Sequence, residues 1–335
     1  MKKILLASFI GVTFIGTSCA TLSDSKVSRL DLIKERGELK CGVSGQIPGF
    51  SFLKSNGNYS GIDVEICKAI AAAIFGDVKK VQYRRLTAPE RFTALKTGEI
   101  DVLSRNTTLN LTRDSAKGNG ATFAPVVFHD GQGLMVKKES RVKSISQLKN
   151  SNICVGSGTT TEQNINDVFQ ERNIPYKPIK YQDLNQVVTG YLKGRCSAMT
   201  SDKSQLAAAR SGFKKPENHI ILDQTLSKEP LAPASVGGDQ RLSDAIRWII
   251  YALFAAEELE ITKENIESKV KLAKENSNLL QLRRLFGIEG NLGNKLGLPN
   301  DFVVLIIKNT GNYEEIYNRH LGDESAVPIP RGLNR

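Results

Sequence analysis

The sequence predicts an α/β protein built from sheets with flanking helices, and two observations support this fold class. Segments with strand and helix patterns alternate along residues 31–130, and the alternation starts again after residue 134. Such alternation is typical of largely parallel sheets covered by helices. The chain has 335 residues, a length that suggests about two domains. We therefore expect each half to form its own sheet.

The expected elements follow from the spacing of apolar residues. In the first half we expect strands at 39–43, 79–86 and 99–103, with helices at 64–75 and 89–97. In the second half we expect strands at 134–137, 152–156, 176–181 and 195–200, with helices at 146–149, 161–172 and 184–193.

The C-terminal third is expected to be helical. An amphipathic helix over residues 241–260 carries Trp248, Tyr251 and Phe254, which we expect in the core rather than in a binding stripe. Residues 262–321 also have helical patterns, with breaks at 287–297 and 311–312. Residues 322–335 show no period and are expected to form a loosely held tail.

The N-terminus has the pattern of a secretory signal peptide. A short cationic start precedes an uncharged apolar run over residues 4–16, which is too short to span a bilayer, and small residues follow at 18–20. Residues 1–20 are the expected signal, with cleavage after Ala20. A lipoprotein acylated at Cys19 is the alternative, but residues 16–18 lack the aliphatic residue usual three places before such a cysteine. We expect the mature chain in a bacterial periplasm.

Charge and composition argue against several classes of function. The net charge of +11 comes from basic residues interspersed with acids, without a basic tract that contains aromatics, so we expect no nucleic-acid binding. The three histidines are scattered and no two cysteines after Cys19 are closely spaced. We therefore expect no metal site and no cofactor.

The four remaining cysteines are Cys41, Cys67, Cys154 and Cys196. An oxidising compartment permits disulfides, and four cysteines allow three pairings. One bridge in each half, Cys41–Cys67 and Cys154–Cys196, is the simplest arrangement. Four buried thiols are the alternative.

Residues 104–113 carry the strongest functional signal. A short strand-like run precedes them, and small hydroxyl and amide residues then lead into a short helix with Arg113 in its first turn. A cation there opposes the helix dipole, and a bound carboxylate would offset this. The carboxylate could take the Arg113 guanidinium, the Thr108 hydroxyl and free helix N–H groups. The alternative is a solvated arginine beside an ordinary turn.

Two further segments have a related pattern. Residues 155–162 form a Gly/Ser/Thr turn between a strand and a helix, and its hydroxyls and N–H groups could hold a carboxylate. A nucleotide-binding loop would end in Gly-Lys-Ser/Thr, which is absent here. Asp202 follows a strand and could pair with an ammonium group, and it could also cap the helix after it.

Together these segments resemble the periplasmic polar amino-acid-binding proteins of ABC importers, solute-binding protein family 3. The resemblance covers residues 31–334 and rests on the signal peptide and on residues 98–101, 106–113, 157–162 and 194–202. Within that family, the chain is most similar to the general L-amino-acid-binding branch. The runs that carry this assignment are residues 90–95, 130–133, 157–162, 227–231 and 311–313.

The resemblance implies a two-lobed, type II periplasmic-binding-protein fold with two crossover strands. Residues 24–129 and 232–335 would form lobe 1 with a C-terminal helical extension, and residues 130–231 would form lobe 2. It also implies a monomer without enzymatic activity that captures a polar L-amino acid between the lobes. The membrane permease and ATPase of an ABC importer would be its partners.

The resemblance also implies roles for residues that bind the amino-acid backbone. Thr108 and Arg113 match the residues that bind the ligand α-carboxylate, with Thr160, next to Thr159 in the threonine run, reaching it from the other lobe. Asp202 matches the acid that binds the α-ammonium group. Asn106 matches a neighbouring polar contact.

Three positions bear on selectivity. Arg91 stands where acidic-amino-acid binders of the family place a side-chain arginine, whereas Ser44 stands where cation-specific members carry an aspartate. We therefore expect glutamate, aspartate and their amides to bind better than lysine or arginine. Ala88 replaces a stacking phenylalanine found in several members. The alternative for Arg91 is a surface residue paired with Glu90 or Asp101.

An enzyme on the same fold, such as a periplasmic dehydratase or deaminase, is the rival hypothesis. It would need a general acid or base beside the reacting carbon. The predicted cleft contains Asp202 and Arg113 but no histidine in a matching motif, so we favour a binding protein.

Overall fold

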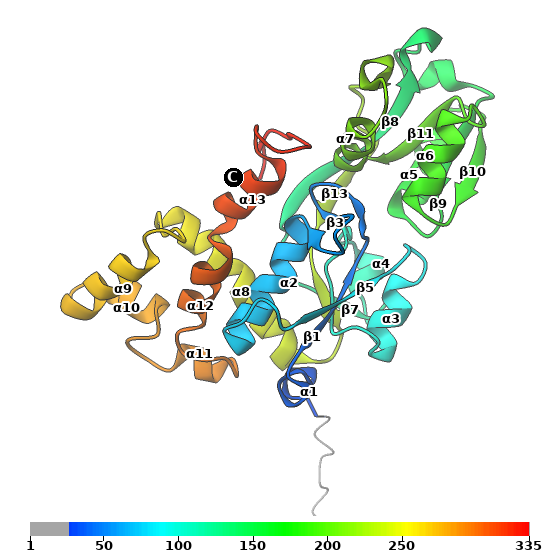
Figure 1. Cartoon of the computed structure of the whole chain (residues 1–335). Helices are drawn as coiled ribbons and strands as arrows, with labels where there is room; N and C mark the ends of the chain where they lie inside the picture. The colour runs from blue at the N-terminus through cyan, green and yellow to red at the C-terminus, as the bar shows by residue number, and fades with distance from the viewer. Residues whose placement is uncertain (1–26, 335) are drawn as a thin grey trace, which may run out of the picture.

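The computed structural model describes residues 27–334, which form two lobes and a helical C-terminal segment (Figure 1). The predicted signal peptide and Cys19 lie outside the described residues. The first lobe is built on a sheet with strand order β5-β1-β6-β14-β7. Its strands are β1 (Leu39–Val43), β5 (Val81–Arg85), β6 (Val102–Leu103), β7 (Ala121–Phe123) and β14 (Ala234–Val236). A small antiparallel sheet beside it contains β2 (Gln46–Ile47), β3 (Ser51–Leu53) and β4 (Tyr59–Ser60).

The second lobe has a mixed sheet with strand order β10-β9-β11-β8-β12. Its strands are β8 (Phe128–Lys137), β9 (Asn152–Gly156), β10 (Lys177–Tyr181), β11 (Ala198–Asp202) and β12 (His219–Ile221). Strand β9 pairs in parallel with β10 and β11, whereas β8 is antiparallel to β11 and β12. The predicted α/β fold with two lobes is therefore confirmed.

Two strands cross between the lobes. The first part of β8 pairs antiparallel with β13 (Lys228–Leu231), in a register that places Lys228 opposite Gly131 and Leu231 opposite Phe128. The expected lobe boundaries at 129/130 and 231/232 fall in this pair of strands. Those boundaries stay a prediction.

The helices cover the sheets and continue into the C-terminal segment. Those of the first 211 residues are α1 (Arg29–Arg36), α2 (Ile62–Phe75), α3 (Arg91–Thr97), α4 (Leu111–Asp114), α5 (Thr160–Glu171), α6 (Leu184–Leu192) and α7 (Lys203–Ser211). The later ones are α8 (Gln240–Glu258), α9 (Ile266–Glu275), α10 (Leu280–Leu285), α11 (Leu292–Lys295), α12 (Phe302–Thr310) and α13 (Tyr313–Leu321). Short 3₁₀ turns lie at residues 138–140, 145–148 and 216–218.

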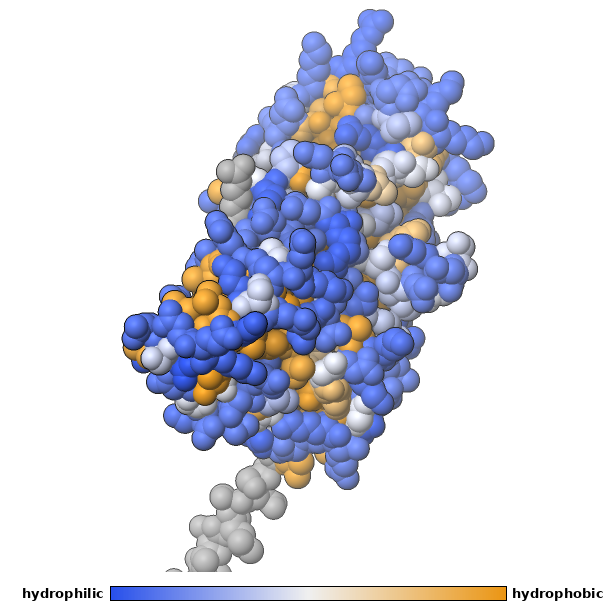
Figure 2. Space-filling model, turned by 60° about the vertical axis from the view of Figure 1, so that its left-hand side comes forward, coloured by the Kyte–Doolittle hydropathy of each residue, from blue (hydrophilic) through white to orange (hydrophobic). Residues whose placement is uncertain are grey.

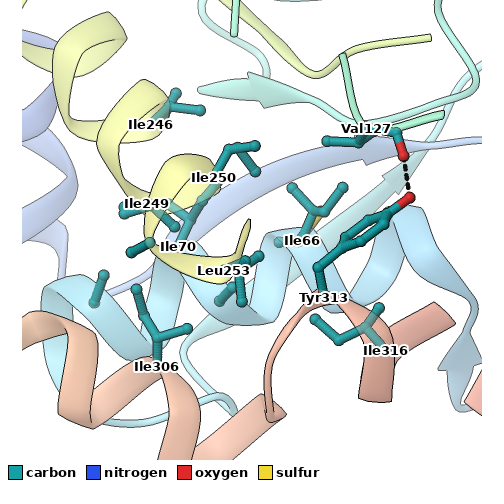
Figure 3. Close-up of a cluster of buried hydrophobic side chains, with 14 of the residues drawn as sticks. Ile66, Ile70, Val127, Ile246, Ile249, Ile250, Leu253, Ile306, Tyr313 and Ile316 are labelled. Carbon is teal, nitrogen blue, oxygen red and sulfur yellow. Dashed lines mark hydrogen bonds between the residues drawn. The ribbon is translucent and has the colours of Figure 1, made fainter. Parts of the chain in front are cut away.

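The core of the first lobe lies between α2, α8, α12 and α13 (Figure 3). Helix α8 contributes Ile246, Ile249, Ile250 and Leu253, whose spacing of three and four residues places them on one face. The hydroxyl of Tyr313 donates a hydrogen bond to the carbonyl of Val127, just before β8. The C-terminal helices are therefore attached to the start of a crossing strand.

Several predicted element bounds were wrong. Strand β8 begins six residues before the predicted strand, because residues 128–131 pair with β13 although their polar and glycine residues show no apolar run. Strand β11 ends at Asp202, two residues beyond the prediction. Helix α11 forms inside the predicted break at 287–297.

The expectation that Trp248 and Tyr251 lie in the core was also wrong. Their side chains are 51% and 45% exposed, and their rings pack edge to face. They line an apolar groove of about 450 Å³ together with residues from α10, α11 and α12. Figure 2 shows apolar surface over this C-terminal segment. The period of α8 predicted its amphipathic character, but not which aromatic residues face the core.

The tail is not loosely held as predicted. Arg331 forms a bidentate ion pair with Glu257 at 2.7 and 3.1 Å, and its guanidinium lies over the rings of Tyr313 and Tyr317. Asn334 accepts a hydrogen bond from the backbone N–H of His129 on β8. These contacts join residues far apart in the sequence, so no local period could reveal them.

Both predicted disulfides are present. Cys41 on β1 is bonded to Cys67 on α2, and Cys154 on β9 is bonded to Cys196 just before β11. Each bridge therefore lies within one sheet-and-helix unit. Among residues 27–334, no helix is both long and apolar enough to cross a bilayer. The same residues contain no cluster of three or more metal-ligating side chains.

We expect the Arg331→Ala variant to lose about 1–3 kcal/mol of unfolding free energy, because Glu257 would keep a largely buried charge without its bidentate partner. Urea unfolding followed by circular dichroism measures this loss. Arg247→Ala is the matched control on α8, because its ion pair with Asp244 is more exposed and should be worth only about 0–1 kcal/mol. Equal effects of the two changes would contradict a structural role for the tail.

Candidate binding site

A small polar cavity of about 50 Å³ lies between the lobes. It is several times larger than the ~10–15 Å³ that one buried water needs. All of the ligand-binding residues predicted from the sequence line it: Ser44, Arg91, Asn106, Thr108, Arg113, Thr159, Thr160 and Asp202. The ends of several strands and the starts of α3 and α5 bring these side chains together. Their roles toward a ligand stay predictions.

Arg113 reaches the cavity from the short helix α4. It is 7% exposed, and its Nη1 donates a 2.8 Å hydrogen bond to the carbonyl of Thr108. Helix α4 has only four residues, so its dipole is weak. The predicted unfavourable interaction between this dipole and the Arg113 cation is therefore small. The backbone N–H of Arg113 is also not free, because the Asn110 side chain caps it at 3.0 Å. The guanidinium is thus the main donor that α4 presents.

Arg91, the first residue of α3, is more deeply buried at 3% exposure. It has no carboxylate within ion-pair distance among the described side chains, so the alternative pairing with Glu90 or Asp101 is wrong. Glu90 accepts hydrogen bonds from Thr87, and Asp101 pairs with Arg36. The Nε of Arg91 has no hydrogen-bond partner within residues 27–334, and its Nη2 donates to the Gly158 carbonyl at 3.3 Å.

Asn106 occupies a left-handed backbone conformation with φ of 41°. Its backbone N–H donates to the buried carboxylate of Asp63 at 3.2 Å, which stabilises this uncommon geometry. The side-chain amide of Asn106 is buried and its oxygen and nitrogen have no partner in the described part of the chain. Ser44 lines the same cavity and is 5% exposed.

The second lobe contributes the start of α5. The Thr159 hydroxyl caps this helix by accepting from the N–H of Glu162 at 3.0 Å, and it donates to the carbonyl of Gly156. Its hydroxyl proton is thus used within the turn. Gly158 adopts φ of 69°, and a Cβ there would lie 3.3 Å from Pro89 on the other lobe. Glycine therefore permits both this turn and the close approach of the lobes.

Asp202 ends β11 and is 3% exposed. It occupies the N-cap position of α7, but its side chain makes no capping hydrogen bond. Instead it accepts a 2.9 Å hydrogen bond from the Gln205 side chain. Burial, with the nearby carboxylates of Asp130 and Glu229, raises the pKa of Asp202 well above its ordinary value. A cation beside Asp202 would relieve this unfavourable environment.

Arg105 is the main cavity residue to which the sequence analysis gave no role. Its Nε donates to the carbonyl of Leu86 at 2.8 Å, and burial lowers its pKa to about 10. Burial and the neighbouring arginines also lower the pKa of Arg91 well below its ordinary value. Arg105 stood in the same motif as Arg113, so its position was the available signal. Other polar side chains that line the cavity without an individually predicted role are Thr161, Gln182, Asp183, Thr200, Ser201 and Gln205.

The chain belongs to a family of bacterial extracellular solute-binding proteins, family 3, whose model matches residues 39–323. It is 43% identical to the general L-amino acid-binding periplasmic protein AapJ of Rhizobium johnstonii, over 100% of this chain and 96% of the relative. It is 42% identical to the glutamate/glutamine/aspartate/asparagine-binding protein BztA of Rhodobacter capsulatus, again over 100% of this chain and 96% of the relative. The resemblance to the general L-amino-acid-binding branch is thereby confirmed.

Solved structures agree with this family and with its type II fold. A periplasmic binding protein of Brucella ovis with glutathione bound has a TM-score of 0.86 and 41% identity, covering 92% of this chain and 95% of that one. The cysteine-binding protein of Campylobacter jejuni has a TM-score of 0.61 and 26% identity, covering 70% and 90%.

We expect Asp63 to make the protein less stable as the pH rises. Burial raises the pKa of its carboxyl group to about 6, against about 3.9 in an unfolded chain. The folded state therefore holds the proton more tightly. Its contribution to stability is fully present below the unfolded pKa and is lost as the pH rises through 6.

The Asp63→Asn variant should lack this loss, so its unfolding free energy relative to wild type should rise by about 3 kcal/mol between pH 3.5 and pH 7. Urea unfolding at both pH values measures the difference. Asp323→Asn, at an exposed carboxylate, is the control. The same pH dependence in wild type and Asp63→Asn would show that Asp63 is not the responsible group.

Proposed function

We propose that this protein is the periplasmic binding component of an ABC importer for polar L-amino acids. The observation that carries the proposal is the placement of Arg113 and Asp202 in one cavity, on opposite lobes. An amino-acid zwitterion has a carboxylate and an ammonium group on the same carbon, so it fits between one cation and one anion. Arg113 would bind the carboxylate and Asp202 the ammonium group.

The mechanism is capture by closure. In the closed arrangement, the Arg91 Nη2 lies 3.3 Å from the Gly158 carbonyl and the Thr108 and Thr160 hydroxyls lie 3.3 Å apart across the cleft. Removing water from the cleft strengthens both ion pairs of the ligand. A ligand that contacts both lobes favours the closed state by its differential affinity. The closed protein would then deliver the amino acid to a permease with its ATPase, and we propose that it acts as a monomer in the periplasm.

Glutamate, aspartate and their amides are the proposed preferred ligands. Arg91 is a buried cation with unused donor capacity, which suits a side-chain carboxylate or amide oxygen. Ser44 supplies no charge to neutralise a cationic side chain. The name of BztA, which lists glutamate, glutamine, aspartate and asparagine, supports this class of ligand, whereas the name of AapJ supports L-amino acids in general.

Glutathione is a second candidate ligand, because the Brucella ovis relative was solved with it bound. Its γ-glutamyl end presents the same α-carboxylate and α-ammonium groups as glutamate. The small volume of the closed cavity favours a free amino acid. A peptide would require a more open arrangement of the lobes.

An enzyme remains the rival, and we propose that this protein is not one. No histidine, lysine or cysteine is among the described residues that line the cavity. Asp202 lines the cavity and its pKa is raised, so Asp202 would be the general base if the protein were an enzyme.

Calorimetry of ligand-stripped protein against the twenty amino acids and glutathione tests the proposal. We expect the acidic amino acids and their amides to bind best, with each ligand recovered unchanged after long incubation. Binding of none of these compounds would refute the proposal, and turnover of a bound amino acid would support the enzyme instead.

We expect Arg113→Ala to abolish measurable binding while the protein stays folded. A ligand carboxylate left unpaired in the closed cleft should cost about 3–5 kcal/mol, or two to four decades in affinity. Calorimetry measures the affinity, and circular dichroism checks the fold. Arg210→Ala, outside the cavity lining, is the matched control. Affinity like that of wild type in Arg113→Ala would show that the α-carboxylate is bound elsewhere.

We expect Arg91→Ala to weaken the binding of glutamate far more than the binding of alanine, because only glutamate has a side-chain carboxylate to lose its partner. The loss for glutamate should be about 2–4 kcal/mol relative to alanine. Competition titrations with both amino acids measure this difference. An equal loss for both ligands, or a wild-type protein that prefers lysine, would remove the selective role of Arg91.

A further inference from the structure

Glu229 on β13 is a buried carboxylate that the ligand scheme does not use. It is 1% exposed and is not among the residues that line the cavity. Its Oε2 accepts hydrogen bonds from the hydroxyls of Thr108 at 2.5 Å and Thr160 at 2.8 Å. Its Oε1 accepts from the Asn164 amide at 2.7 Å and from the Ser227 hydroxyl.

These donors come from both lobes. Thr108 belongs to the loop after β6 in the first lobe and is held next to β13 by a bridge to Leu231. Thr160 and Asn164 lie one turn apart on α5 in the second lobe. Glu229 itself lies opposite Asp130 where β13 pairs with β8. The carboxylate therefore lies between the crossing strands and both walls of the cleft.

Neutral donors satisfy this charge. Among the described residues, no lysine, arginine or histidine nitrogen lies within 4.0 Å of Glu229. An ionised carboxylate can only accept hydrogen bonds, and a buried one is costly unless its oxygens are satisfied. Separation of the lobes would move Thr108, in the first lobe, away from Thr160 and Asn164, in the second, so the carboxylate could not keep both sets of partners. The hydrogen bonds therefore favour the closed arrangement.

We propose that Glu229 is a positioning residue that joins the two lobes in the closed form and thereby sets the affinity for every ligand. We call Glu229 and its partners Thr108, Thr160 and Asn164 the Glu229 clasp. Loss of the clasp would lower the closed fraction of the free protein. The apparent affinity falls in proportion to that fraction. The effect on affinity rests on the proposed function, whereas the effect on lobe closure does not.

The clasp also sets whether the Thr108 and Thr160 hydroxyls can donate a hydrogen bond to the ligand or only accept one. A hydroxyl has one proton to donate, and both the Thr108 and the Thr160 hydroxyl donate theirs to Glu229. Toward the cavity they present lone pairs, which suit an ammonium or amide N–H. The ligand α-carboxylate must then be bound by Arg113 and backbone N–H groups. This differs from the roles that the family resemblance implied for the two hydroxyls.

Small-angle X-ray scattering of ligand-stripped protein tests the clasp directly. We expect Glu229→Gln and Asn164→Ala to increase the radius of gyration relative to wild type, and Glu275→Gln, at an exposed glutamate of α9, to leave it unchanged. Asn164 does not line the cavity and is only partly buried, so its variant carries the test if Glu229→Gln fails to fold. An unchanged radius in the folded variants would overturn the clasp.

Calorimetry with glutamate, glutamine and alanine provides the second measurement. In Asn164→Ala, which keeps the Thr108 and Thr160 hydroxyls donating to Glu229, a closed fraction that falls to a tenth should weaken all three ligands by the same factor of about ten. Losses that differ between the ligands in this variant would overturn the indirect role. If none of the three binds to wild type, the proposed function fails while the scattering result still decides the clasp.

Discussion

The antiparallel pairing of β8 with β13 is the contact on which the binding site depends. These strands connect the two lobes, so their register sets which parts of the lobes can meet. Tyr313 and Asn334 attach the C-terminal helices and tail to the same region, through Val127 and His129. The C-terminal segment therefore contacts the crossing strands near the start of β8, whereas Glu229 on β13 contacts α5 of the second lobe.

Charge burial is the second constraint. Arginines from one lobe and carboxylates from the other lie in the same small cavity without a direct ion pair between them. Such groups are costly to desolvate unless a partner neutralises them. An amino-acid zwitterion with an acidic side chain would supply carboxylates for the arginines and an ammonium group for Asp202. The same features that shift the pKa values of Arg91 and Asp202 thus favour ligand capture.

Local patterns predicted the fold class, one disulfide in each half, and part of the cavity lining, namely Thr108, Arg113, Asp202 and the threonine turn at 159–160. Strand and helix periods are properties of neighbouring residues, and a strand that ends in a Gly/Ser/Thr turn places its polar side chains at the sheet edge. The runs 104–113 and 155–162 could therefore each be predicted to bind a carboxylate, and the family resemblance placed them in one cleft. The family resemblance added the roles of Arg91 and Ser44, which no local period indicates.

The sequence by itself determined the two α/β units and many of the polar residues at the strand ends, because short-range spacing encodes both. It also restricted the four cysteines to three pairings, of which one bridge in each half was the simplest. Only the tertiary structure decided the partners: that Arg91 has no carboxylate partner among residues 27–334, that Asp202 does not cap α7, that the C-terminal tail is bound to α8 and β8, and that Glu229 accepts hydrogen bonds from two threonine hydroxyls. Most of these contacts join residues that are distant in the chain. They arise when separate elements pack together, and no local pattern carries that information.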